Sequence, residues 1–186
     1  MLEIYGSKAC PFAWRTRIAA FEKGVAFEWL PGDVPNPDPR VAARNPEGTS
    51  PLAYHDATRI TESLVIAQYI DEGFPGRPMQ PGTARERAEM RSLIAELAGL
   101  EKGIKGKPDD SETRKKVDAA YATLDGAIED GREWLGGTTL SLADASVMPV
   151  LASVVGNGFK IPPRLERATK YWDRVQGQVS FRETKP

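Results

Sequence analysis

The sequence predicts two structural parts: an α/β domain over residues 1–74 and an all-helical domain over residues 84–186, joined by a linker over residues 75–83. Short β-like runs alternate with helical runs in the first part, as expected of a small α/β layer structure. Only helical periodicity is found in the second part. Between them, residues 74–82 hold three prolines and two glycines, which break any helix and indicate a linker.

The first part is expected to contain four strands and two helices. In chain order these are a strand at 2–5, a helix at 11–22, a strand at 26–30, strands at 52–54 and 58–60, and a helix at 62–71. The last two strands flank His55, Asp56 and Ala57 at hairpin spacing, which makes His55, the only histidine, a solvated turn residue. Residues 31–39 hold four prolines and are expected to be an irregular surface loop.

The second part is expected to consist of helices. Two sets of apolar residues follow the i, i+3, i+4, i+7 spacing of a buried helix face. They are Met90, Leu93, Ile94, Leu97 and Leu100, and Val117, Ala120, Tyr121, Leu124 and Ile128. A further helix should start at Ser141, whose hydroxyl can accept an unpaired backbone N–H, while Asp144 can reach back to the same turn. Asp144 is therefore interpreted as a structural cap and not as a catalytic acid.

Composition excludes several classes of function. The 186 residues carry 25 basic and 26 acidic side chains, so no excess positive charge exists for electrostatic binding of nucleic acid. The mean hydropathy is −0.42, and no apolar run approaches the roughly 18 residues of a membrane span. No metal-ligand cluster or phosphate-binding loop is found. The N-terminus lacks a signal-peptide pattern and a single cysteine forms no internal disulfide, so a soluble cytoplasmic protein is expected.

The chemistry that the sequence offers is concentrated at Cys10. This residue follows the first strand and precedes the first helix, and Pro11 suits the first helical turn because its missing N–H would be unpaired there anyway. The helix dipole and free backbone N–H groups at this end stabilise a thiolate, and Lys8 could add positive charge. Ala13 stands where a second cysteine would permit dithiol exchange. The alternative is an inert buried cysteine.

Four segments, taken in order, resemble a cytosolic glutathione transferase. They are YGSKACPFAWRTRIAAFEKG, NPEGTSPL, ITESLVIAQYIDE and LSLADASVMPVL. The resemblance covers nearly the whole chain and implies the glutathione transferase fold, an α/β thioredoxin-like N-terminal domain plus an all-α C-terminal helical domain. The Cys-Pro-Phe-Ala start is most similar to the omega and dehydroascorbate-reductase-like branches, in which cysteine replaces the tyrosine or serine of other classes.

The resemblance also implies a glutathione-binding site, with glutathione as co-substrate and no metal. Cys10 matches the catalytic cysteine and would form a mixed disulfide with glutathione, with Phe12 beside the thiol. Pro51 matches a proline that follows a cis peptide bond in thioredoxin-like folds. The backbone of Ser50 would pair with the cysteinyl part of glutathione as an added strand does.

The resemblance assigns residues to the γ-glutamyl end of glutathione and leaves the residue at the glycine end open. Glu62 would face the ammonium of the γ-glutamyl end, and Ser63, with the N–H groups that open its helix, would hold the carboxylate. Without the resemblance, Glu62 and Ser63 are interpreted as a plain helix cap. For the glycine end, Arg40 and Arg44 are candidates, and both could equally be surface charges.

The helical part departs from the family in length. Residues 84–134 are fewer than in the usual pair of long helices, and Gly103, Gly106 and Pro108 are expected to end the first helix early. In the family these helices wall the pocket for the acceptor substrate and build the homodimer contact. An open pocket and an altered or lost dimer contact are therefore expected.

Three functions stay open. The first, favoured by the Cys-Pro-Phe-Ala start, is a glutathione-dependent thiol transferase or reductase, in which Cys10 carries the mixed disulfide and a second glutathione releases it. The second is a conjugating transferase, in which the glutathione thiolate attacks a small electrophile and Cys10, Ser7 or Tyr5 only stabilises that thiolate. The third is a binding or scaffold protein on the same fold.

Overall fold

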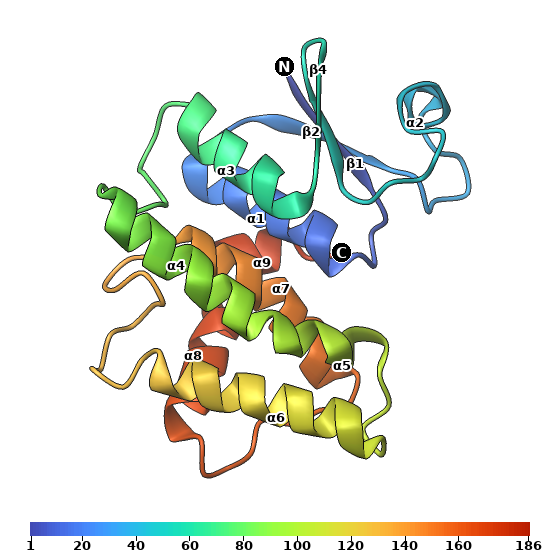
Figure 1. Ribbon diagram of the computed structural model, residues 1–186. Helices are drawn as coiled ribbons and strands as arrows, with labels where there is room; N and C mark the ends of the chain where they lie inside the picture. The colour runs from blue at the N-terminus through green and yellow to red at the C-terminus, as the bar shows by residue number, and fades with distance from the viewer. The chain divides into compact units, whose positions relative to one another are not determined.

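The computed structural model describes all 186 residues, Met1–Pro186. The chain forms two compact units, one of Met1–Met79 with Glu183–Pro186 and one of Gln80–Arg182. The first unit is α/β and the second is helical (Figure 1), as the sequence predicts. The boundaries of a glutathione-binding domain over 1–74, a linker over 75–83 and a helical domain over 84–186 stay a prediction. None of the helices has the length and apolar character needed to cross a membrane.

The first unit is built on a four-stranded sheet of order β2-β1-β3-β4. Its strands are β1 (Leu2–Gly6), β2 (Phe27–Pro31), β3 (Leu52–His55) and β4 (Thr58–Thr61). Its helices are α1 (Pro11–Lys23), α2 (Pro39–Arg44) and α3 (Ser63–Gly73). β1 pairs parallel with β2, and β3 runs antiparallel to both β1 and β4. A parallel pair needs a crossover, which α1 supplies. All four predicted strands are confirmed within one residue at each end.

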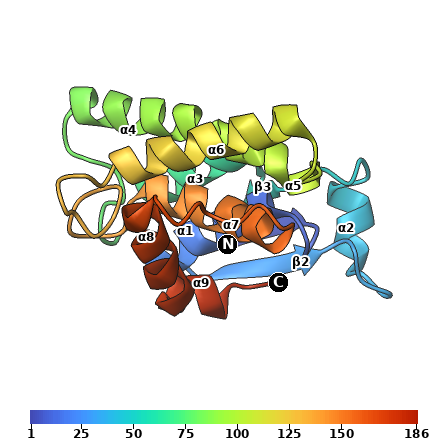
Figure 2. The ribbon, with the colours of Figure 1, turned by 90° about the horizontal axis from the view of Figure 1, so that it is seen from below.

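Helices cover both faces of the sheet. Side chains alternate along β1, so successive residues of this strand pack on opposite faces. Leu2 and Ile4 belong to a buried cluster that includes residues of α1 and α3. Tyr5 belongs to a second cluster, against which Val41 of α2 packs. In Figures 1 and 2, α2 accordingly lies on the far side of the strands from α1 and α3. Cys10 lies in the connection from β1 to α1, at the end of the central strand pair.

The prediction of an irregular loop over residues 31–39 is wrong at both ends. Pro31 is the last residue of β2 and Pro39 is the first residue of α2. The Asp38 carboxylate caps α2 by accepting the Arg40 backbone N–H at 2.8 Å. An aspartate followed by proline at the first helical position is a local helix-start signal.

The prediction that His55 is a solvated turn residue is also wrong. His55 ends β3, and its side chain is only 29% exposed. Its Nδ1 lies 2.7 Å from the Tyr69 hydroxyl, and its ring centroid lies 4.8 Å from that of Phe74. His55 is therefore a packing residue at the edge of the first cluster.

The second unit consists of packed helices. They are α4 (Ala84–Glu96), the 3-10 helix η1 (Leu97–Glu101), α5 (Lys102–Lys105), α6 (Ser111–Gly126), α7 (Leu142–Gly156), α8 (Glu166–Gly177) and α9 (Val179–Glu183), whose last residue belongs to the first unit. Both predicted apolar faces are buried, except that Leu93 is half-buried. α7 is buried over most of its length and packs against α4, η1, α5 and α8.

Of the residues predicted to end the first helix early, Gly103 lies inside the helical run, whereas Gly106 directly follows its end. α4 stops at Glu96, and the chain then continues through η1 into α5, which contains Gly103. A Cβ at Gly103 would lie 2.9 Å from Val154 Cγ1, so the glycine permits close packing against α7. The helical run ends at Lys105, directly before Gly106.

Candidate functional site

Cys10 is the N-cap residue of α1, with Pro11 in the first turn, as predicted. Its backbone N–H donates to the Ser7 carbonyl at 3.2 Å. The side chain is half-buried, and its Sγ lies 3.5 Å from the Ser50 carbonyl oxygen, to which the thiol can donate. Partial exposure at the amino end of a helix suits a reactive thiol better than an inert buried one.

The loop before Cys10 is held by Asp33, a residue that the sequence analysis missed. The Ser7 hydroxyl donates to Asp33 Oδ2 at 2.7 Å, and the Lys8 backbone N–H donates to both carboxylate oxygens at 2.8 and 2.9 Å. Burial by itself raises the pKa of Asp33, but these hydrogen bonds outweigh it and hold the pKa below its ordinary value. The ionised carboxylate therefore anchors the loop that ends in Cys10.

Ser50 connects this loop to β3. The Ser50–Pro51 peptide bond is cis, as the resemblance implied. Ser50 Oγ accepts the Ser7 backbone N–H at 2.8 Å, while its carbonyl faces Cys10. A Cβ at Gly6 would lie 2.7 Å from Ser50 Oγ, so only glycine allows Ser50 to approach β1 this closely. The structure thus brings Cys10 and Ser50 together directly.

Glu62 is the N-cap residue of α3, yet its side chain makes no capping hydrogen bond. It is exposed, and its backbone has a φ of +66°, which non-glycine residues rarely adopt. Such a conformation costs about 1–3 kcal/mol and is concentrated at ligand-binding sites. The geometry therefore argues against the plain-cap interpretation of Glu62.

Arg15 is a second residue that the sequence analysis missed, and it contacts Ser63. Arg15 Nη1 donates to Ser63 Oγ at 3.0 Å, which joins α1 to the start of α3. The same guanidinium lies 5.3 Å from the centroid of the Phe12 ring. Arg15 therefore contacts both Phe12 and Ser63, and α1, which supplies Phe12 and Arg15, begins directly after Cys10.

Tyr5 and Ser7, the two hydroxyls left open as alternatives to Cys10, are engaged elsewhere. Tyr5 is fully buried, and its hydroxyl donates to Glu3 Oε2 at 2.7 Å. Burial, and then the Glu3 carboxylate, raise the pKa of Tyr5 to about 12. The Ser7 hydroxyl is bound to Asp33. Neither hydroxyl is placed to donate to a thiolate.

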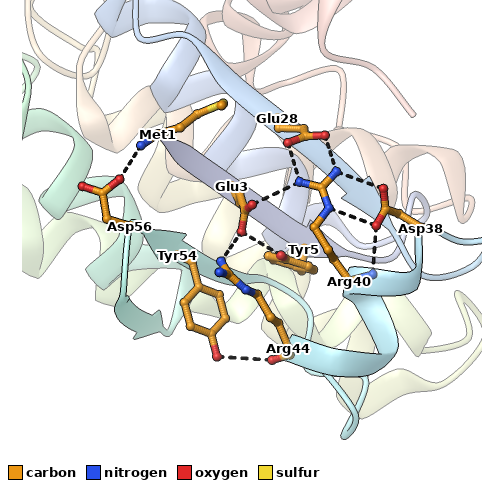
Figure 3. A network of polar contacts seen from close by, with 9 residues as sticks. All are labelled: Met1, Glu3, Tyr5, Glu28, Asp38, Arg40, Arg44, Tyr54 and Asp56. Atoms are coloured by element: carbon orange, nitrogen blue, oxygen red, sulfur yellow. Dashed lines mark hydrogen bonds and ion pairs between the residues drawn. The ribbon is translucent and has the colours of Figure 1, made fainter.

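Arg40 and Arg44 belong to a surface network over the face that α2 covers (Figure 3). Arg40 pairs with Glu28, Asp38 and Glu3, and Arg44 Nη1 lies 2.6 Å from Glu3 Oε2. Of the two alternatives for these arginines, the structure favours the surface charges. No group of three or more His, Cys, Asp or Glu side chains that could hold a metal ion is present.

Comparison with known proteins connects both units to one family. The family model for the glutathione S-transferase N-terminal domain matches residues 4–78, and the model for the glutathione S-transferase C-terminal domain matches residues 87–178. A rice protein (Oryza sativa subsp. japonica) named probable glutathione S-transferase GSTU1 is 30% identical, over 91% of this chain and 84% of that protein.

Omega-class proteins are among the similar ones. Mouse (Mus musculus) glutathione S-transferase omega-1 is 23% identical, and the match covers 80% of this chain. The chain spans only 65% of the length of that mouse protein. The crystal structure of glutathione transferase Omega 3C from Trametes versicolor superposes with a TM-score of 0.83 at 18% identity, over 98% of this chain and 88% of that one. This last likeness shows the shared fold.

Proposed function

The chain belongs to the glutathione S-transferase family, whose co-substrate is glutathione, and we propose that it is a glutathione-dependent thiol transferase that carries glutathione on Cys10. The observation that carries this proposal is the position of Cys10, half-exposed at the amino end of α1 beside the Ser50 carbonyl. The substrate class is a small disulfide that contains glutathione.

The reaction proceeds in two exchange steps. The Cys10 thiolate attacks the glutathionyl sulfur of the substrate, so that a Cys10–glutathione S–S bond forms and the substrate's S–S bond breaks. The substrate leaves as a thiolate and takes a proton from water. A second glutathione, as thiolate, attacks the glutathionyl sulfur on Cys10, which releases oxidised glutathione and restores the Cys10 thiolate. One disulfide is reduced and one is formed, so the electrons balance without another reductant.

The chain's own residues support a single-thiol route. Cys10 is the only cysteine, so no second thiol can resolve the mixed disulfide internally. Asp33 and Ser50 fix the loop that places the sulfur. The exposed Glu62 carboxylate would attract the γ-glutamyl ammonium, and Ser50 and Pro51 would present backbone groups to the cysteinyl part.

A conjugating transferase is the second candidate, because glutathione S-transferases outside the omega class, such as the rice GSTU1 protein at 30% identity, match about as well as the mouse omega-1 protein at 23%. Two assays run side by side separate the candidates: reduction by glutathione of hydroxyethyl disulfide, which first forms a mixed disulfide with glutathione, and conjugation of chlorodinitrobenzene. We expect clear activity in the first assay. Conjugation alone would support the second candidate, and absence of glutathione binding by calorimetry would support a scaffold role.

Replacing Glu62 with glutamine tests the proposed glutathione site. The change removes the charge that faces the ammonium of glutathione, and a charged hydrogen bond contributes roughly 1.5–3 kcal/mol. We expect the calorimetric Kd for glutathione to rise about tenfold or more. The melting temperature should not change, because the Glu62 side chain makes no capping hydrogen bond.

The matched control is Glu129→Gln, which changes charge equally at an exposed position of the second unit. Its Kd should equal that of the unaltered protein. An unchanged Kd in Glu62→Gln, with a lowered melting temperature, would return Glu62 to the role of a helix cap. A cytoplasmic location and an altered or lost dimer contact stay predictions, and sedimentation of the purified chain measures the second.

A further inference from the structure

Arg17 of α1 is a buried cation, and two of its three guanidinium nitrogens have no hydrogen-bond partner. It is 5% exposed, and its Nε and Nη2 atoms are buried and have no hydrogen-bond partner. Its guanidinium lies 4.4 Å from the ring centroid of Trp29 on β2, which supplies a face but no acceptor. Burial of a charged group is unfavourable unless an opposite charge compensates it. The arrangement therefore points to an anion near Arg17.

The geometry directs Arg17 toward the loop that ends in Cys10. The two residues are seven positions apart, about two helical turns, so they share one side of α1. Side chains on a helix lean toward its amino end, and a long arginine side chain covers much of that distance. Trp29 marks the same place, because a Cβ at Gly6, the residue that opens this loop, would lie 3.4 Å from Trp29 Cη2.

Cys10 and Asp33 are the two acidic groups whose charges act on Arg17. Burial lowers the pKa of Arg17 to about 10, and the negative charges of Cys10 and Asp33 oppose that shift. The Asp33 oxygens already accept the Ser7 hydroxyl and the Lys8 backbone N–H. Lys8 and Arg15 are the other nearby cations. The Lys8 side chain is exposed to solvent, and Arg15 donates a hydrogen bond to Ser63. Neutral donors thus already satisfy the Asp33 charge, whereas the Cys10 sulfur contacts only the Ser50 carbonyl, an acceptor that cannot stabilise a thiolate.

We propose that Arg17 is the positioning residue whose buried charge stabilises the Cys10 thiolate. The inference rests on the proposed function, in which this thiolate is both the attacking and the leaving sulfur. A buried charge acts over several ångströms with little screening, so a direct hydrogen bond is not needed. The same charge would favour release of glutathione from Cys10 in the second step, because a stabilised thiolate leaves faster.

The test measures the rate of Cys10 alkylation by iodoacetamide as a function of pH. Since the chain has one cysteine, the whole signal reports Cys10. Arg17→Met keeps the packing against Trp29 and removes the charge. We expect the midpoint of its rate curve to rise by about one pH unit, which makes alkylation about tenfold slower at acidic pH. Arg17→Lys should restore most of the original midpoint.

Lys8→Met is the matched control, because it removes an exposed charge from the same loop. Its midpoint should change much less, since water and salt screen exposed charges. The proposal is overturned if folded Arg17→Met, checked by circular dichroism, keeps the original midpoint. It is also overturned if Arg17→Lys shifts as far as Arg17→Met, because packing rather than charge would then be responsible.

A measurement on the unaltered protein decides the question if Arg17→Met does not fold. A buried charge predicts that the midpoint stays nearly constant between about 20 and 500 mM salt. A marked rise with salt would assign the effect to exposed Lys8 and overturn the proposal. Alkylation requires no glutathione, so a failure of thiol transfer would count against the proposed function and not against Arg17.

Discussion

Cys10→Ser is expected to lose thiol transfer completely, down to the background rate of free glutathione. Disulfide exchange requires sulfur at the attacked and attacking positions, and a serine hydroxyl cannot form the mixed disulfide. The hydroxyl can still donate a hydrogen bond to a glutathione thiolate, so conjugation should persist or rise. Reduction of hydroxyethyl disulfide and conjugation of chlorodinitrobenzene, measured on the same preparation, check both parts.

Cys10→Ala is the control for this pair of activities, because alanine neither forms a disulfide nor donates a hydrogen bond. It should lose thiol transfer and should not gain conjugation. If Cys10→Ser retains the reductase rate of the unaltered protein, Cys10 is not the carrier. The structure offers no replacement on the same loop, because the Ser7 hydroxyl is bound to Asp33.

Asp144→Ala is expected to cause the largest loss of stability. Asp144 is fully buried at the start of α7 and forms the predicted capping box with Ser141. Its carboxylate accepts the Ser141 N–H and hydroxyl at 2.8 and 2.7 Å, the Leu135 N–H at 2.8 Å and the Tyr171 hydroxyl at 3.1 Å. Alanine leaves these donors buried without an acceptor, and each such group costs about 1–3 kcal/mol. The free energy of unfolding should fall by about 4 kcal/mol or more.

Urea denaturation measures this loss, and Glu89→Ala is its control. Glu89 pairs with Arg85 one turn earlier in α4, but both side chains are largely exposed. An exposed pair of this kind contributes about 0.3–0.5 kcal/mol, so the control should unfold almost like the unaltered protein. A loss below about 1 kcal/mol in Asp144→Ala would contradict the structural role.

The strands and the two-part organisation were predictable because their signals are local. Alternation of apolar residues and the placement of proline and glycine act over a few positions. His55 was misplaced because its partners, Tyr69 and Phe74, lie 14 and more residues further along the chain. Helix α2 was missed although Asp38 and Pro39 carry a local start signal, because the surrounding prolines dominated the interpretation.

The residues of the site likewise divide into those that a local signal marks and those that only the folded chain brings together. The position of Cys10 between a strand and a helix marked it as a candidate site residue. Pro51 and Glu62 became candidates for glutathione binding only through the resemblance. Asp33 could not be found, because it binds Ser7 from 26 positions away and nothing local marks that contact. Arg17 could not be found either, because its burial against Trp29 depends on how α1 lies on the sheet.

The central claim, that Cys10 carries glutathione, is tested most directly by intact-protein mass spectrometry after incubation with oxidised glutathione. The account predicts one adduct of about 305 Da on the unaltered protein, as disulfide exchange at a single thiol requires. The adduct should disappear with reductant and be absent from Cys10→Ser. An unaltered protein that stays unmodified, under conditions in which iodoacetamide alkylates Cys10 fully, would contradict the claim.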